Sequence, residues 1–253
     1  MSRFELKNQC AIVTGAGKGI GLATASAFAR AGADVAVLDI NADAARDAAR
    51  SIAISGRRAI ALACDVTDAT QLESALDEAA SALGGIDILV NNAGTAVRKT
   101  ALELSLEQWD RVMDLNVKAT FLASRTAVRH MMRRGGGAIV NLASIMGLSG
   151  GLYPNASYQA SKGAVVNLTR ALALEWAGEK IRVNAVAPTF VRTDLTVPIF
   201  SDPVAFERVM AHTPLGVLPD VDDIALAILF LASPAARCIT GITLPVDSGY
   251  LAR

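Results

Sequence analysis

The stretch TGAGKGIG at residues 14–21 decides the fold class, because it sets four glycines between an apolar run and an Ala-rich run. The apolar run at 9–14 predicts a strand, and the Ala-rich run at 19–31 predicts a helix. Glycine lets the chain turn tightly and lets a phosphate approach the backbone, and the first N–H groups of a helix attract anions. The stretch therefore predicts a strand–turn–helix unit that binds the pyrophosphate of a dinucleotide.

The glycine spacing differs from the common G-x-G-x-x-G pattern, since Ile20 stands where the third glycine would fall. The stretch instead fits T-G-x-x-x-G-x-G through Gly15, Gly19 and Gly21. A tight turn between a strand and a helix can need glycine for structural reasons alone. The context favours dinucleotide binding, and we expect Gly15, Lys18, Gly19, Ile20 and Gly21 to contact the cofactor.

Asp39 indicates which dinucleotide is bound, because it ends the predicted strand at 33–39, 18 residues beyond Gly21. An acidic residue at this place accepts hydrogen bonds from the adenosine ribose and disfavours a 2′-phosphate. Asp39 could instead cap the next helix, but Asn41 is better placed for that task. Lys18 would favour NADP through its positive charge. We give Asp39 the greater weight and expect NAD, with NADP as the less favoured cofactor.

Outward from this unit, short apolar runs alternate with longer helical runs as far as residue 246. Strands are predicted at 9–14, 33–39, 57–64, 86–91, 138–144, 181–187 and 241–246, and helices at 19–31, 42–55, 68–83, 105–133, 157–177 and 220–232. Strands that are apolar on both faces and are separated by helices predict a parallel sheet covered on both sides. We expect an α/β protein, a single-domain Rossmann fold over 1–253, with a doubly wound parallel sheet of about seven strands.

Composition narrows the classes of protein further, since 52% of residues are apolar, mean hydropathy is +0.38, and 24 basic residues balance 24 acidic ones. A disordered chain is excluded, and broad binding to nucleic acid or to an anionic membrane is not expected. The apolar run 224–232 is too short to cross a bilayer, and Glu5 and Lys7 argue against a signal peptide. We expect a cytoplasmic protein. His130 and His212 are the only histidines, and no metal site is expected.

Several motifs in order carry a resemblance to a known family. They are TGAGKGIG at 14–21, Asp65-Val66, NNAG at 91–94, Asn116, Ser144, the Tyr158-x-x-x-Lys162 pair and Pro188-Thr189. Along almost its whole length the chain resembles the short-chain dehydrogenase/reductase family, including its gluconate 5-dehydrogenase-like and 3-oxoacyl-(acyl carrier protein) reductase-like members. Each residue alone also has an ordinary structural explanation, such as a cap or a solvated helix start. Their joint occurrence favours the family.

The chemistry of the predicted catalytic residues agrees with this resemblance. Tyr158 and Lys162 lie one helical turn apart and share a face. A free phenol has a pKa near 10, and a neighbouring ammonium favours the phenolate, which prepares it for proton transfer. Ser144 can donate a hydrogen bond to the substrate oxygen. The resemblance further implies that Lys162 holds the nicotinamide ribose and that Asn116 fixes a water molecule that relays protons.

The resemblance also implies the remaining cofactor contacts. Asp65 and Val66 would bracket the adenine, and Asn92, Ala93 and Gly94 would lie along the ribose on the nicotinamide side. Residues 188–193, including Pro188, Val191 and Thr193, would line the nicotinamide face. Thr189 departs from the glycine that the family more often has after this proline.

The substrate region is expected in the extended connection at 192–214, which would form a lid over the ligand end of the sheet. Arg98, Ser144 and Asn155 are the candidate substrate residues, and Arg98 suits a carboxylate, although an exposed structural arginine is an equal alternative. A basic group comprising Arg129, His130, Arg133 and Arg134 is read either as a solvated helix end or as a docking patch for an acidic acyl carrier protein.

These observations lead to an expected function and to two alternatives. We expect an NAD-dependent enzyme that interconverts a secondary alcohol and a ketone on a polyol, sugar acid or hydroxy acid, with Tyr158 as acid and base. The alternatives are an NADPH-dependent 3-oxoacyl-thioester reductase and a dinucleotide-sensing scaffold. Apolar residues on more than one side of the helices at 105–133 and 157–177 indicate subunit packing, and the resemblance implies a homotetramer.

Overall fold

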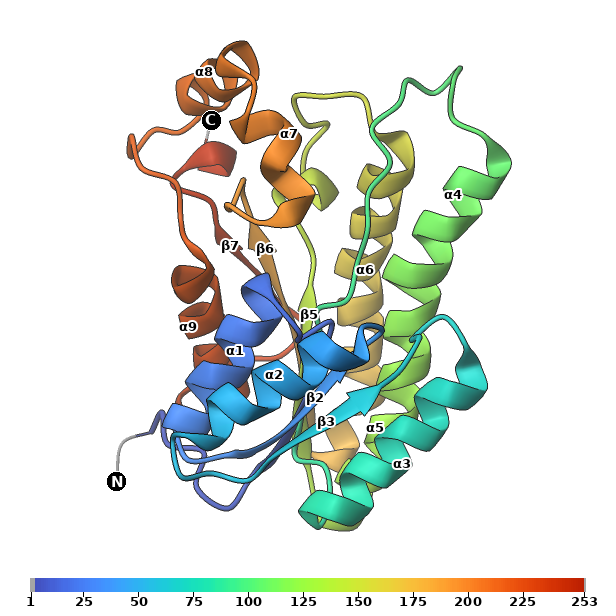
Figure 1. Cartoon of the computed structure of the whole chain (residues 1–253), viewed down its shortest axis with the longest axis vertical. Coiled ribbons are helices and arrows are strands. Elements are labelled where there is room, and N and C mark those ends of the chain that lie inside the picture. Colours follow the sequence, from blue (N-terminus) through green and yellow to red (C-terminus); the bar gives the residue numbers. More distant parts are fainter. Residues whose placement is uncertain (1–2, 253) are drawn as a thin grey trace.

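All seven strands lie side by side in one parallel sheet in the computed structural model, which describes residues 3–252 (Figure 1). The order across the sheet is β3-β2-β1-β4-β5-β6-β7, which extends the doubly wound order by one strand. The strands are β1 (Cys10–Thr14), β2 (Asp34–Asp39), β3 (Ala59–Ala63), β4 (Ile88–Asn91), β5 (Gly137–Leu142), β6 (Ile181–Pro188) and β7 (Thr243–Val246). The sheet predicted from sequence is thus confirmed.

Helices cover both faces of the sheet, as the alternation of elements predicted. One face carries α1 (Gly19–Arg30), α2 (Ala42–Ala53) and α9 (Val221–Ala232), and the other carries α3 (Ala69–Leu83), α5 (Ala119–Arg134) and α6 (Ala156–Glu175). The buried residues of β1 explain the two layers, because successive side chains of a strand point to opposite faces. Ala11 and Val13 join the first core, and Cys10 and Ile12 join the second.

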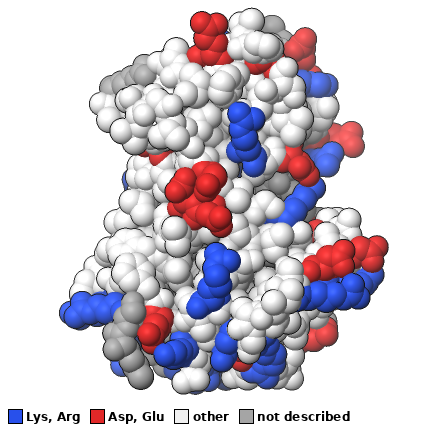
Figure 2. All heavy atoms as spheres, turned by 60° about the vertical axis from the view of Figure 1, so that its left-hand side comes forward, with Lys and Arg blue, Asp and Glu red and all other residues white. Residues whose placement is uncertain are grey.

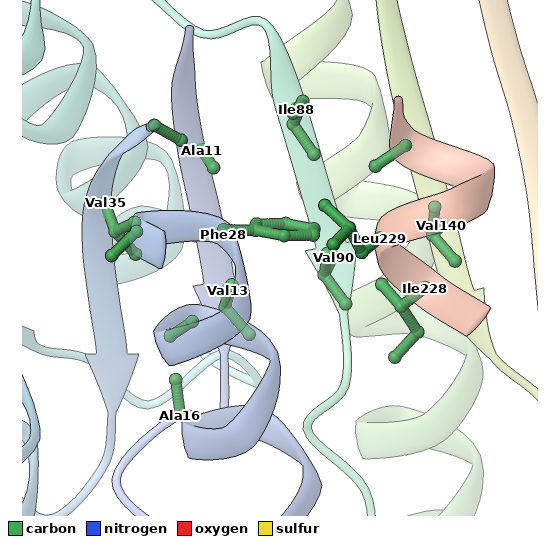
Figure 3. Close-up of a cluster of buried hydrophobic side chains, with 14 of the residues drawn as sticks. Ala11, Val13, Ala16, Phe28, Val35, Ile88, Val90, Val140, Ile228 and Leu229 are labelled. Carbon is green, nitrogen blue, oxygen red and sulfur yellow. The ribbon is translucent and has the colours of Figure 1, made fainter. Parts of the chain in front are cut away.

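Phe28 shows how a helix is fixed onto the sheet. Its side chain is fully buried and points from α1 toward Leu229 of α9 and Val90 of β4 (Figure 3). Burial of a phenylalanine side chain contributes about 1.5–3 kcal/mol to stability. This contact helps to hold α1, and with it the glycine-rich turn at its N-terminus, at a fixed height over the sheet.

The predicted helix at 105–133 is interrupted in the structure. The chain forms α4 (Leu106–Met113), a π-helical turn (Asp114–Lys118) and then α5. A π turn accommodates an extra residue within a helix and often marks a functional position. This turn contains Asn116, so the prediction of one regular helix was wrong at the place where a candidate site residue lies.

The sequence led us to expect an extended loop at 192–214, but part of this connection is helical. It contains a 3-10 turn (Asp194–Thr196) and two helices, α7 (Val197–Phe200) and α8 (Pro203–Ala211). Asp202 caps α8 through the N–H groups of Val204 and Ala205. Figure 1 shows α7 and α8 above the carboxyl ends of β6 and β7, at the end of the sheet where the lid was predicted.

Charged residues on the face shown in Figure 2 are interspersed and of both signs, as a net charge of zero would suggest. Within residues 3–252, no helix combines the length and apolar character needed to span a membrane. The same residues contain no group of three or more His, Cys, Asp or Glu side chains that could hold a metal ion.

Candidate active site

The glycine-rich turn between β1 and α1 is packed so closely that side chains are excluded. A Cβ atom at Gly21 would lie 2.3 Å from the carbonyl oxygen of Gly15, and one at Gly15 would lie 2.9 Å from Cα of Ala93. Gly15 also has a positive φ of 61°, which favours glycine. Glycine at these two positions therefore lets the turn pack against the segment after β4, while Gly19 of the same turn lines the cleft.

The start of α1 has hydrogen-bond donors available for a phosphate. Within residues 3–252, no side chain caps this helix, whose N-cap residue is Lys18. Asn92 holds the turn in shape from the end of β4, since its Nδ2 donates to the carbonyl oxygens of Thr14 and Gly15, each at 2.9 Å. Uncapped N–H groups at a helix start, beside a glycine-rich turn, fit a dinucleotide pyrophosphate.

Asp39 lies at the carboxyl end of β2 beside the same turn. One carboxylate oxygen accepts the N–H of Gly17 at 2.9 Å, and the other accepts the N–H of Asn41 at 3.0 Å. A Cβ at Gly17 would lie 2.8 Å from Asp39 Oδ2, so glycine is needed there too. Asn41 is the cap of α2, as predicted. Asp39 is thus fixed at the edge of the turn rather than used as a helix cap.

A cleft of about 380 Å³ runs from the glycine-rich turn to the predicted catalytic residues. It brings together many of the residues predicted from sequence, which are Lys18, Gly19, Ile20, Asn92, Gly94, Ser144, Tyr158, Lys162, Pro188, Val191 and Thr193. Gly15, Gly21, Asp39, Asp65, Val66, Ala93 and Asn116 are outside its lining. Asp39 ends β2, and Asp65 follows the neighbouring strand β3, so both lie at the carboxyl ends of two paired parallel strands.

Tyr158 and Lys162 come from the first turns of α6, and Ser144 follows β5. Gly147 lets the segment after β5 lie directly against α6, since a Cβ there would come within 2.6 Å of the Lys162 carbonyl. The Lys162 side chain is buried, its Nζ donates to the Leu142 carbonyl at 2.5 Å, and it lies 5.7 Å from the centre of the Tyr158 ring. The three side chains meet at the inner end of the cleft.

Burial sets the protonation of these two groups, and it corrects a prediction. The pKa of Tyr158 is raised above 10 by burial, although the hydrogen bond from Ser144 and the charge of Arg98 act in the opposite direction. Burial also lowers the pKa of Lys162 to about 8. The sequence led us to expect that Lys162 favours the phenolate, but burial raises the pKa of Tyr158, because desolvation favours the neutral form of both groups.

Asn116 connects three segments around the site instead of facing the cleft. Its Oδ1 accepts the N–H of Thr95, and its Nδ2 donates to the Thr95 carbonyl and to Ser161 Oγ, each at 2.9 Å. Thr95 follows Gly94 in the cleft wall, and Ser161 precedes Lys162 on α6. The side chain of Asn116 thus fixes the relative positions of two walls of the cleft.

A second, smaller cavity of about 60 Å³ adjoins the cleft and is lined by the candidate substrate residues Arg98, Ser144 and Asn155. Asn155 is buried, and its Oδ1 accepts from Gln159 at 2.8 Å. Arg98 is exposed, and its guanidinium donates to the Leu195 carbonyl of the lid at 2.7 Å. The two cavities share Ser144, Tyr158, Thr189, Leu195 and Thr196.

Several lining residues were not predicted from sequence. Asp194, Leu195 and Thr196 all come from the lid beyond residue 193, the last residue predicted from sequence to lie along the nicotinamide face, whereas Arg192 lies within the predicted range 188–193. Asp194 pairs with Lys18 at 2.5 Å, and the Arg192 guanidinium lies 4.3 Å from the centre of the Phe200 ring. The Asp-Pro pair at 202–203 could have revealed α8, but the lid contacts depend on the folded path of the chain.

Comparison with known proteins agrees with the geometry of this site. A family model described as enoyl-(acyl carrier protein) reductase matches residues 15–251. Galactitol 2-dehydrogenase (L-tagatose-forming) of Cereibacter sphaeroides is 47% identical over 250 residues, which cover 98% of this chain and 96% of that protein. NAD-dependent glycerol dehydrogenase of Listeria innocua is 39% identical over 247 residues, with 98% and 95% covered.

A solved structure agrees at the level of the fold. The gluconate 5-dehydrogenase of Burkholderia cenocepacia, crystallised with NADP and tartrate, has a TM-score of 0.95 and 35% identity, covering 99% of this chain and 98% of that one. The chain belongs to the short-chain dehydrogenase/reductase family. It is an oxidoreductase of the NAD(P)-dependent class that acts on CH–OH groups.

Proposed function

We propose that this protein is an NAD-dependent dehydrogenase that interconverts a secondary alcohol and a ketone on a polyol, sugar acid or hydroxy acid. The observation that carries the proposal is that Ser144 and Tyr158 line both cavities. A carbinol held in the smaller cavity would therefore lie against the inner end of the dinucleotide cleft. The names of the galactitol and glycerol dehydrogenases add support, because both act on polyols.

The residues at this junction suit proton transfer to or from the carbinol oxygen. In the oxidation direction Tyr158 acts as the phenolate: its oxygen takes the hydroxyl proton and becomes the neutral phenol, while Ser144 donates a hydrogen bond that orients the carbinol oxygen. Lys162 keeps the wall of the cleft in place through the Leu142 carbonyl. When bound, the oxidised nicotinamide would supply the hydride acceptor and a positive charge, and a positive charge near a phenol favours the phenolate.

Asp39 supports NAD over NADP. Its carboxylate lies beside Gly17 at the edge of the glycine-rich turn, where it can accept ribose hydroxyls and would repel a 2′-phosphate. Lys18, the residue that would favour NADP, is paired with Asp194. Relatives differ in this respect, since the gluconate enzyme was crystallised with NADP and the glycerol enzyme is named as NAD-dependent.

The basic group near the end of α5 gives no support to reduction of carrier-bound 3-oxoacyl thioesters. Arg129 pairs with Glu73 at 2.9 Å, His130 with Asp77 at 2.6 Å, and Arg134 with Asp87 at 3.0 Å. The Arg133 guanidinium donates to Nδ1 of His130 at 2.7 Å. The charges of Arg129 and Arg134 are therefore matched within the chain, and a small polyhydroxylated substrate remains the better proposal.

Purified enzyme tests this function directly. Polyols, sugar acids and hydroxy acids are assayed for NADH and NADPH formation, together with Tyr158→Phe and the control Tyr250→Phe. We expect NAD-dependent oxidation, a loss of about 100-fold or more in kcat for Tyr158→Phe, and an unchanged dinucleotide Kd. If Arg98 binds a carboxylate, Arg98→Ala raises KM for the acids alone. Near-normal turnover by Tyr158→Phe would remove the proposed role of the phenol.

We also propose a homotetramer. Leu174 on α6 is 82% exposed and Phe121 on α5 is 38% exposed. Both helices carry apolar residues on more than one side, and packing against further copies would cover them. Sedimentation of the purified protein measures its mass in solution.

A further inference from the structure

Thr189 is the first residue after β6, and it lies between the two cavities. Its N–H donates to the Val246 carbonyl of β7 at 3.1 Å, which fixes its backbone at the edge of the sheet. The residue is only 9% exposed and lines both the dinucleotide cleft and the smaller cavity. Its side chain therefore belongs to the junction at which Ser144 and Tyr158 also lie.

The Thr189 hydroxyl is unusual in its lack of hydrogen bonds. Its Oγ1 is buried and finds no partner among residues 3–252. Two threonines of the lid, by contrast, have hydrogen-bond partners. Thr196 Oγ1 donates to the Val191 carbonyl at 2.5 Å, and Thr213 Oγ1 donates to the Val209 carbonyl at 2.8 Å. A buried hydroxyl without a partner costs about 1–3 kcal/mol, so a ligand that supplies the partner gains that amount.

The identity of the missing partner follows from the surroundings. Four other buried side-chain atoms of residues 3–252 also lack partners, on Thr24, Arg57, Ser157 and Thr243, but Thr189 is the one that lines both cavities. A threonine hydroxyl is neutral and can both donate and accept, as a substrate hydroxyl can.

We propose that the Thr189 hydroxyl binds a second substrate hydroxyl, on the carbon next to the reacting carbinol, and so makes the enzyme selective for vicinal diols. The inference rests on the proposed function, in which the carbinol oxygen lies between Ser144 and Tyr158. A neighbouring hydroxyl then reaches the part of the junction that Thr189 lines. A site that hydrogen-bonds a substrate hydroxyl discriminates against the analogue that lacks it, because the site's own polar group is left unpaired.

Butane-2,3-diol and butan-2-ol are the two probes, since they differ only in the neighbouring hydroxyl. We expect wild type to prefer the diol in kcat/KM with NAD. Thr189→Val should lower kcat/KM for the diol by about 10-fold, the loss of one hydrogen bond of about 1.4 kcal/mol, and leave butan-2-ol within twofold. Thr189→Ser should restore the preference. Thr243→Val is the matched control, because Thr243 Oγ1 is also buried and unpartnered but lies outside both cavities.

The outcomes separate this inference from the proposed function. Equal losses on both probes, or a wild type with no preference for the diol, overturn the role of Thr189 while the dehydrogenase activity stands. A raised NAD Kd for Thr189→Val shows that the hydroxyl serves the cofactor and also overturns it. If wild type oxidises no polyol or secondary alcohol with NAD or NADP, the proposed function fails first and the inference fails with it. Circular dichroism confirms that each variant is folded.

Discussion

Lys162 and Tyr158 lie within one cleft, and burial acts on both in the direction of the neutral form. Burial lowers the pKa of Lys162 to about 8 and raises that of Tyr158. The Lys162 ammonium is also directed to the Leu142 carbonyl rather than to the phenol oxygen. Burial and the direction of the Lys162 ammonium therefore both act against the phenolate form of Tyr158.

The shifted pKa of Lys162 predicts a specific pH dependence of stability. The free energy of unfolding of wild type minus that of Lys162→Met should be constant below about pH 8 and rise at about 1.4 kcal/mol per pH unit above it. Between pH 8 and 10.5 the unfolded chain holds the lysine proton and the folded chain does not, so higher pH favours folding. The whole change amounts to about 3 kcal/mol.

Urea unfolding at pH 7, 8, 9 and 10 measures this difference. Lys99→Met is the control, because Lys99 is exposed, and its difference from wild type should stay flat with pH. A flat difference for Lys162→Met as well would show that the folded protein keeps this lysine charged up to pH 10. Using the difference between variants cancels the titration of tyrosines and cysteines common to both proteins.

Among single residues, the sequence predicted those that belong to short motifs with fixed spacing. Tyr158, Lys162 and Ser144 were identified because their motifs are short and their places next to a strand end or helix start are readable. The clamp of Asn92 on Thr14 could not be read, since 78 residues separate the partners. The direction of the Tyr158 pKa shift was missed for a related reason, because burial depends on the lid that covers the cleft.

Among the elements of secondary structure, the π turn at 114–118 holds two walls of the cleft together. It lies between α4 and α5 and presents Asn116 to Thr95 on one side and to Ser161 on the other. The Asn116 carbonyl is also engaged, since it accepts from Thr120 Oγ1 at 2.9 Å. The turn thus joins the segment after β4 to α6 through one buried amide.

Asn116→Ala should lower the free energy of unfolding by about 2 kcal/mol, because it leaves the N–H and the carbonyl of Thr95 without partners in a half-buried segment. It should also speed hydrogen exchange at the Thr95 amide. Urea unfolding and exchange measured by NMR give the two values. Glu107→Ala on the exposed side of α4 is the control and should stay within about 0.5 kcal/mol. Unchanged exchange at Thr95 would mean that another group takes over the amide.

The elements themselves were predictable where the pattern was long and regular. All seven strands and the helices that cover the sheet were found to within a few residues, because buried parallel strands and long helices leave clear periodic patterns. The π turn gave no signal, since its residues also fit an ordinary helix. Helices α7 and α8 were missed because they are short, although the Asp202 cap followed by Pro203 is a recognisable helix start.

Across the whole molecule, Arg182 joins the sheet to the helices on one face. It lies on β6, and its guanidinium donates to carbonyls at the end of α9 and just beyond it, with Nη1 to Leu231 at 2.6 Å and Nη2 to Ala232 at 3.0 Å. Weaker contacts reach Ser233 and Ile239. A cation at a helix C-terminus also complements the helix dipole. This one side chain therefore fixes α9 against the strand that ends at the active site.

Arg182→Met should destabilise the protein by about 3 kcal/mol, because several carbonyls at the end of α9 lose a charge-assisted donor and are left partly buried. The stability of Arg182→Lys should lie between that of Arg182→Met and that of wild type. An ammonium lacks the planar fork with which the guanidinium bonds several carbonyls at once. Urea unfolding measures both, and Arg30→Met at the exposed end of α1 is the control. An unchanged dependence on urea concentration in all variants would show that the fold still unfolds as one cooperative unit. If Arg182→Met unfolds at the wild-type midpoint, packing alone holds α9 to the sheet.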